Sequence, residues 1–262
     1  MKLRLLALAL ALGAPATASA HDTWVQANTN LVRTGDVVHL DLMLGNHGND
    51  HRDFKLASKI DLDGCTLDVL SPDGKTYDLT SDLVDTGYAP KEGFWTSRFV
   101  AAKPGLYTVA HTVNSLFRTK RTIKSGKTYF MVSDSLDDVK PAGDGFDEPL
   151  GHALEFVPLT NPAAPLGPGQ TIEVQLFYQG KPLPDARVSF IPRSAALSAG
   201  FDKRYERKTD AEGKAAYEPT EGDYHLIVAH LEAPDQQGAG YTTTKYSATL
   251  TLYVPQICPC CQ

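Results

Sequence analysis

The sequence predicts an all-β protein, with two tandem immunoglobulin-like or prealbumin-like β-sandwich domains behind a cleaved signal peptide. Three observations lead to this fold class. Short runs alternate apolar and polar residues, few convincing helical periods follow the first twenty residues, and turns rich in Gly, Pro, Asn and Asp separate the runs. Sandwiches of both kinds are built from such short strands.

The first twenty residues have the pattern of a secretory signal peptide. Lys2 and Arg4 give a positive start, an apolar run follows, and Ala18-Ser19-Ala20 supplies the small residues that precede a cleavage site. The apolar run is shorter than the roughly 20 residues that span a bilayer, and no later run is long enough. We therefore expect a soluble periplasmic or secreted protein whose mature chain begins with a free His21. Cleavage one or two residues away is the alternative.

The mature chain suits two domains. Removing 20 of the 262 residues leaves 242, which is long for one domain and comfortable for two of roughly 100–150 residues. The segment Ser133–Glu148 is rich in Asp, Gly and Pro, a composition typical of a linker. The predicted boundaries are a signal peptide at 1–20, an N-terminal sandwich at 21–133, a linker at 134–149, a C-terminal sandwich at 150–255 and a cysteine-rich tail at 256–262.

Candidate strands follow one another in both halves. In the first half, Asp36–Leu44 alternates, the turn Ser71–Lys75 joins two further strands, Leu106–Val113 places Tyr107, Val109, His111 and Val113 on one face, and Lys127–Val132 closes the domain. In the second half the predicted strands are Leu154–Pro158, Thr171–Tyr178, Arg187–Ile191, Lys214–Glu218, Tyr224–His230 and Tyr246–Tyr253.

The charge balance limits the classes of partner. The chain has 25 basic and 31 acidic residues; losing Lys2 and Arg4 leaves 23 − 31 = −8 for the mature chain. An acidic surface argues against nucleic acid and anionic lipid and is compatible with cations. We expect no nucleic-acid partner and no direct membrane insertion.

Three segments together resemble one family. They are His21-Asp22-Thr23-Trp24 with the later Gly45-Asn46-His47, then Gly151–Pro162, and finally Gly180–Val188 with Thr209–Lys214 and Glu221–Tyr224. The chain thereby resembles the DUF4198 family, periplasmic proteins labelled as nickel or cobalt uptake components, over most of its mature length. The resemblance implies that the protein binds nickel or cobalt and serves a membrane metal transporter. The last segment is also a general feature of prealbumin-like and carboxypeptidase-regulatory-like sandwiches, so it indicates fold more than function.

Histidines are the candidate metal ligands. A mature His21 has two ligand nitrogens close together, the α-amine and the ring Nδ1, which suit Cu(II) or Ni(II) when a further imidazole joins them. His47 and His51 lie four apart in a Gly/Asn/Asp loop, which is also the composition of an ordinary polar loop. His111 is either a third ligand or a hydrogen-bonded core histidine. The predicted ligand set is His21, His47 and His111, with His152 in reserve, for Ni, Co or Cu.

Two other histidines lie in the strand Tyr224–His230. His225 and His230 are five residues apart, so alternation places them on opposite faces of the strand, and they cannot both line one flat site.

The cysteines are open to two interpretations. Cys258, Cys260 and Cys261 form a terminal cluster that can bind a soft ion, although an oxidising compartment favours disulfides. Cys65 either pairs with a tail cysteine or remains a free thiol.

No enzyme signature is present in the sequence. G-x-S-x-G, H-E-x-x-H, a P-loop and a Gly-rich dinucleotide turn are all missing, so we expect no enzyme. The alternatives to a metal-binding protein are a copper-dependent oxidative enzyme that uses His21 and a non-catalytic β-sandwich interaction module.

Overall fold

A computed structural model describes residues 21–45, 60, 62–87, 93–140, 145–164, 167–193, 195–198 and 200–256. The predicted signal peptide, the loop with His47 and His51, and the cysteines of the tail lie outside these described residues.

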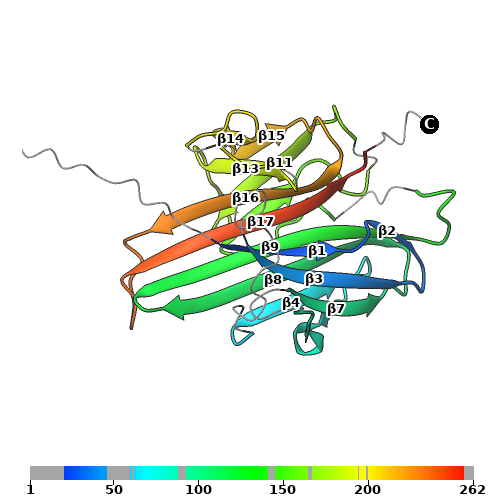
Figure 1. The fold of residues 1–262 in the computed structure, drawn as a ribbon, viewed down its shortest axis with the longest axis horizontal. Helices are drawn as coiled ribbons and strands as arrows, with labels where there is room; N and C mark the ends of the chain where they lie inside the picture. The colour runs from blue at the N-terminus through cyan, green and yellow to red at the C-terminus, as the bar shows by residue number, and fades with distance from the viewer. Residues whose placement is uncertain are drawn as a thin grey trace, which may run out of the picture.

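One large sheet forms the centre of the molecule (Figure 1). It has nine strands in the order β14 (Glu206–Lys208), β13 (Arg187–Pro192), β16 (Asp223–Ala233), β17 (Thr243–Val254), β9 (Lys120–Ser133), β8 (Gly105–Phe117), β4 (Cys65–Leu70) and β5 (Thr76–Asp78), with β2 (Leu31–Arg33) paired to β9. Apart from the isolated turn of 3-10 helix η2 (Thr80–Asp82), the regular structure of the described residues is strand, so the predicted all-β class is confirmed.

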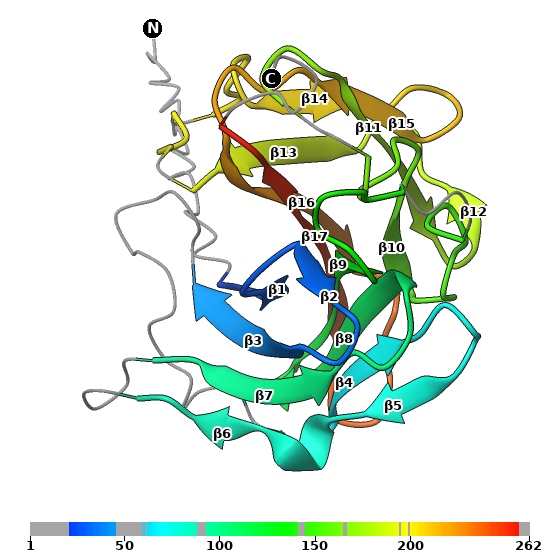
Figure 2. The same ribbon diagram turned by 90° about the vertical axis from the view of Figure 1, so that its right-hand side faces the viewer.

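Two smaller sheets pack on opposite faces of the large one (Figure 2). The first has the order β1 (Asp22–Ala27), β3 (Val37–Gly45), β7 (Trp95–Val100) and β6 (Val84–Asp85). The second contains β10 (Leu154–Pro158), β11 (Ile172–Tyr178), β12 (Lys181–Pro182) and β15 (Lys214–Tyr217). Each small sheet and the facing part of the large sheet make a β-sandwich.

The two sandwiches share the large sheet. Strand β9, from the first half of the chain, pairs in parallel with β17, from the second, in a register that runs from Lys120 opposite Thr243 to Thr128 opposite Thr251. A continuous ladder of backbone hydrogen bonds therefore joins the two halves. The domain boundaries given in the sequence analysis stay a prediction. The structure adds that backbone hydrogen bonds between β9 and β17 connect the two halves of the chain.

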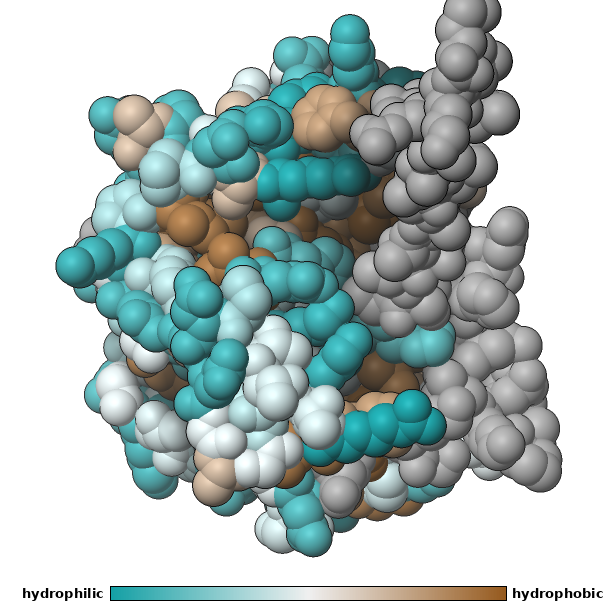
Figure 3. All heavy atoms as spheres, turned by 90° about the vertical axis from the view of Figure 1, so that its left-hand side faces the viewer, coloured by the Kyte–Doolittle hydropathy of each residue, from teal (hydrophilic) through white to brown (hydrophobic). Residues whose placement is uncertain are grey.

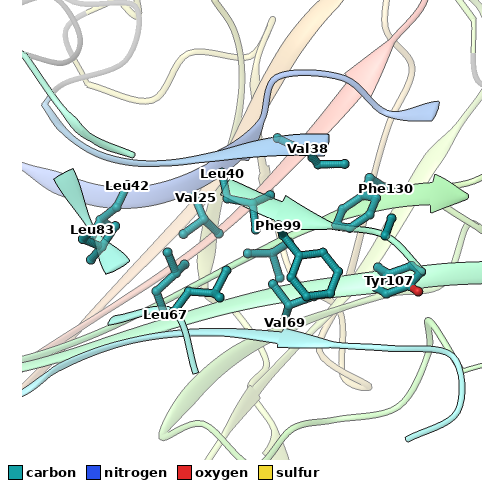
Figure 4. Close-up of a cluster of buried hydrophobic side chains, with 14 of the residues drawn as sticks. Val25, Val38, Leu40, Leu42, Leu67, Val69, Leu83, Phe99, Tyr107 and Phe130 are labelled. Atoms are coloured by element: carbon teal, nitrogen blue, oxygen red, sulfur yellow. The ribbon is translucent and has the colours of Figure 1, made fainter. Parts of the chain in front are cut away.

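Alternation along the strands fills the two cores. In β8, Tyr107 and Val109 face the N-terminal core, while Leu106 faces the C-terminal core. The same division places Phe130 in the first core and Tyr129 in the second. Figure 4 shows the N-terminal core, where aliphatic side chains of β1 and β3 meet those of β4 and the ring of Phe99. Because successive side chains point to opposite faces, one sheet can supply both cores.

A third, smaller cluster fixes how the first strand lies on the second half. Trp24 of β1 and Met43 of β3 pack against Ile191 of β13 and against Leu226 and Val228 of β16, and all five are buried. The start of β1 is thereby held against the C-terminal strands. Within the described part of the chain, no helix is long and apolar enough to cross a membrane.

Candidate functional site

A groove of about 830 Å³ opens beside the start of β1, on the same face of the large sheet as the N-terminal sheet, in a part of that face which the N-terminal sheet leaves uncovered. Strands β8, β9, β13, β14, β16 and β17 contribute to it, together with His21 and with Asp22, the first residue of β1. Its floor is apolar where Ile191, Leu226 and Val228 lie, and its sides are polar. Figure 3 shows the end of the molecule that carries the β8–β9 and β16–β17 hairpin tips, where hydrophobic surface lies recessed between projecting hydrophilic side chains.

Asp22 anchors the chain start in this groove. One of its carboxylate oxygens accepts hydrogen bonds from Ser247 Oγ at 2.7 Å and from His230 Nε2 at 2.8 Å. The preceding carbonyl, of His21, accepts a hydrogen bond from Lys124 Nζ at 2.6 Å. Burial raises the pKa of Asp22, but the charge and hydrogen bond of His230 outweigh it and hold this pKa below its ordinary value. Asp22 is therefore ionised in the folded protein at neutral pH.

The hydrogen bond to Asp22 determines the orientation of the His230 ring and the position of its Nε2 proton. Burial lowers the pKa of His230, but the Asp22 carboxylate outweighs it and raises that pKa above its ordinary value. Because a carboxylate only accepts, Nε2 carries the proton, and in the neutral ring the lone pair is on Nδ1. The side chain is 48% exposed and lines the groove together with His21. Asp22 thus orients the ring, and Nδ1 becomes available as a metal ligand when the imidazolium gives up its Nδ1 proton.

The strand register explains why His230 reaches the groove. His230 pairs across β16 and β17 with Ser247, and the alternate residues Leu226, Val228 and Glu232 share its face of the sheet. His225 points the other way and is fully buried, so the prediction that the two histidines lie on opposite faces is confirmed. Burial lowers the pKa of His225.

Gly126 leaves room for a side-chain bond between the large sheet and β1. A Cβ at this position would lie 2.9 Å from Thr249 Oγ1 and 3.6 Å from the Cα of Trp24. Thr249 Oγ1 in turn donates to the carbonyl of Thr23 at 3.0 Å. A side chain at position 126 would therefore displace the Thr249 hydroxyl and its hydrogen bond to β1.

His111 is a core histidine and does not line the groove. Its Nδ1 lies 3.0 Å from the carbonyl of Thr66, which can only accept, so Nδ1 carries the proton. Its Nε2 then accepts a hydrogen bond from Thr23 Oγ1 at 3.0 Å. Both ring nitrogens are occupied, and burial lowers the pKa of His111 to about 4. Of the two interpretations that the sequence left open, the structure favours the hydrogen-bonded core histidine over the third ligand.

The state of His111 gives a testable dependence of stability on pH. In the unfolded chain His111 binds a proton near pH 6.5, whereas in the folded chain it does so only near pH 4. The free energy of unfolding therefore falls as the pH falls between these values. The expected loss is about 3 kcal/mol. We expect His111→Gln to flatten this part of the profile, measured as the free energy of unfolding in urea at several pH values. His39→Gln, at an exposed position, is the control; an unchanged slope in His111→Gln would contradict the prediction.

His152 lies in a different place from His21. Its backbone N–H donates to Glu155 at 2.9 Å, and its Nδ1 is buried with no hydrogen-bond partner. Burial lowers its pKa, against the charge of Glu155. His152 does not line the groove.

The predicted ligand set is not assembled among the described residues. They contain no group of three or more His, Cys, Asp or Glu side chains placed to hold a metal ion. His21 lies in the groove, His111 and His152 lie elsewhere, and the place of His47 in the set stays a prediction because it is outside the described chain. The sequence interpretation missed His230 as a partner, since 208 residues separate it from Asp22.

Cys65 is a buried free thiol. Its Sγ lies 3.7 Å from Nδ1 of His111, and burial raises its pKa to about 12. The thiol is therefore protonated at neutral pH and is a poor metal ligand in this state.

The chain is distantly similar to several solved structures. The D0-D1 domain of intimin is 12% identical with a TM-score of 0.26, over 90% of this chain and 100% of that one. A DUF4785 family protein from Legionella pneumophila is 12% identical with a TM-score of 0.28, over 78% of this chain and 52% of that one. Salmonella alpha-2-macroglobulin reacted with methylamine is 15% identical with a TM-score of 0.27, and the match covers 90% of this chain but only 15% of that one.

No curated protein matches the chain. A family model described as a domain of unknown function, DUF4198, matches residues 18–233. The match covers most of the chain and confirms the resemblance stated above, so the protein belongs to the DUF4198 family.

Proposed function

We propose that this protein is a periplasmic binding protein for a divalent transition metal and that its site lies at the start of β1. Nickel or cobalt is the proposed cargo, and a membrane metal transporter the proposed recipient, because the family resemblance implies both. The observation that supports the site best is the hydrogen bond between Asp22 and His230, which places a second imidazole in the same groove as His21.

The donor set fits such an ion. After the predicted cleavage, His21 offers its α-amine, whose pKa of about 7.7–8.0 leaves part of it unprotonated at neutral pH, and its ring nitrogen. His230 offers Nδ1. Three nitrogen ligands suit Ni(II), Co(II) and Cu(II) better than they suit hard cations such as Mg(II) or Ca(II).

Asp22 would act without touching the metal. A carboxylate that accepts the N–H of a ligand histidine fixes the ring orientation and makes the other nitrogen more basic. Ser247 and its own burial hold Asp22 in place. The same arrangement explains why an acid follows the terminal histidine at this position.

The test is calorimetry on mature protein that begins at His21, titrated with Ni(II), Co(II) and Cu(II). We expect micromolar or tighter binding of at least one ion. Affinity no better than millimolar for all three would overturn the proposal.

Replacement of His230 tests the site itself. We expect His230→Ala to weaken binding by more than the roughly 10- to 100-fold loss expected for Asp22→Asn, because the first removes a ligand and the second removes only its support. His39→Ala, at an exposed position outside the groove, is the matched control and should bind as the unmodified protein does. Equal affinity in His230→Ala and His39→Ala would remove His230 from the site.

A further inference from the structure

The groove is far larger than a metal ion needs. Ligand atoms lie about 2 Å from a transition metal, so an ion and its ligands occupy only one end of a groove of this size. A volume of about 830 Å³ lies instead in the range of sites that hold small organic molecules.

The proposed protein ligands leave coordination positions open. His21 and His230 supply three nitrogens, whereas nickel and cobalt commonly take four to six donors. The described residues provide no further His, Cys, Asp or Glu that would complete a group of three such side chains. The remaining donors must come from solvent, from a part of the chain outside the described residues, or from a molecule that arrives with the metal.

The charges around the groove favour an anion. Four cations line it, Lys120, Lys124, Arg187 and Lys245, against the three acids Asp22, Glu206 and Glu232. The formal charge of the lysine, arginine, aspartate and glutamate side chains that line the groove is therefore 4 − 3 = +1, whereas the formal charge of the predicted mature chain is −8. A bound divalent ion would bring the local sum to about +3, which an anionic companion would offset.

The acids are already engaged by other groups. Glu206 pairs with Arg187, Glu232 pairs with Lys245, and Asp22 accepts from His230. None of the ion pairs found in the described chain involves Lys120 or Lys124. Lys124 Nζ donates to the carbonyl of His21 and so lies next to the proposed chelate.

We propose that the groove binds the metal together with a small polycarboxylate chelator. Carboxylate oxygens of the chelator fill the open coordination positions and pair with Lys120 and Lys124, and hydroxyl groups of Ser115 and Thr122 lie on the same wall. This inference rests on the proposed metal site and states that the metal reaches the protein as a chelate.

The experiment uses citrate as the chelator. Mature protein is dialysed to equilibrium against radiolabelled citrate, against Ni(II), and against an equimolar mixture, and both components are counted in the protein compartment. We expect citrate to be retained from the mixture at about one per protein and one per nickel, and citrate alone to be retained at least tenfold less.

Charge variants locate the chelator. We expect Lys120→Gln to lower citrate retention about tenfold, because it removes a charged hydrogen-bond donor to a carboxylate of the chelator. Binding of Ni(II) alone should stay unchanged in this variant. Lys181→Gln, at an exposed lysine outside the groove, is the matched control.

The outcomes separate the two proposals. Nickel retained from the mixture without citrate would overturn the chelate inference and leave the metal site intact. Citrate retained equally with and without nickel would also overturn it, since the groove would then be a plain anion site. No nickel retained under any condition would overturn both.

Discussion

Retaining a single extra residue in front of His21 is expected to weaken metal binding by about 100-fold or more. A protein that begins at Ala20 has its α-amine one residue away and a peptide nitrogen where the amine of His21 would be. A neutral amide nitrogen is a poor ligand, and the amine of Ala20 no longer forms the direct chelate with the His21 imidazole. Loss of a partner that merely orients a ligand already costs about 10- to 100-fold, and here a ligand itself is lost.

The measurement is calorimetry with Ni(II) on the two proteins side by side. Both retain Asp22 with its bonds to His230 and Ser247, so their thermal unfolding without metal should coincide. His230→Ala in the Ala20 form should then lose nearly all remaining affinity. Equal affinity of the two forms would show that the amine takes no part, and the metal proposal would then rest on imidazoles alone.

Sequence patterns predicted those parts of the fold that depend on neighbouring residues. Alternation placed Val109 and His111 on one buried face, and the Asp73-Gly74 turn between β4 and β5 was recognised because its residue types suit a turn. The strand at Leu154–Pro158 was predicted with the bounds that the structure has. Local chemistry was sufficient in each case.

The shared sheet and the site depend on contacts that local patterns do not specify. The parallel pairing of β9 with β17 joins segments more than 100 residues apart, and alternation is compatible with many partners. His111 illustrates the same limit. Its type and strand position suited a ligand as well as a core residue, and only the positions of Thr66 and Thr23 distinguish the two. The bond between Asp22 and His230 was likewise invisible in the sequence.

The buried ion pair of Lys127 and Glu155 is where a single substitution should cost most in stability. Both side chains are 2% exposed, and the pair links β9 of the shared sheet to β10 of the C-terminal sheet. Glu155 also accepts backbone hydrogen bonds from Leu150 at 2.6 Å and from Gly151 and His152 at 2.9 Å. Burial raises the pKa of Glu155, but the charge and hydrogen bond of Lys127, together with the backbone donor of Leu150 and the charge of His152, outweigh it and keep this pKa below its ordinary value.

We expect Glu155→Ala to lower the free energy of unfolding by about 3–5 kcal/mol, because it leaves a buried ammonium without its partner and three backbone donors without an acceptor. Lys127→Met should cost less, since the carboxylate keeps its backbone donors. Unfolding in urea, followed by circular dichroism, measures both. Asp185→Asn, which keeps a residue type that tolerates the positive φ of 55° here, removes the charge of an exposed pair with Lys208 and should cost less than about 1 kcal/mol.

The relative losses of stability in the three variants distinguish attraction within the ion pair from support of the backbone by Glu155. If the pair acted only through its mutual attraction, Glu155→Ala and Lys127→Met would cost the same. If the carboxylate mainly holds the Leu150–His152 segment, Glu155→Ala is the more costly and Lys127→Met approaches the exposed control. A loss below about 1 kcal/mol for Glu155→Ala would mean that the Lys127 ammonium finds water or loses its proton at small cost, contrary to the expected penalty for a buried, unpaired charge.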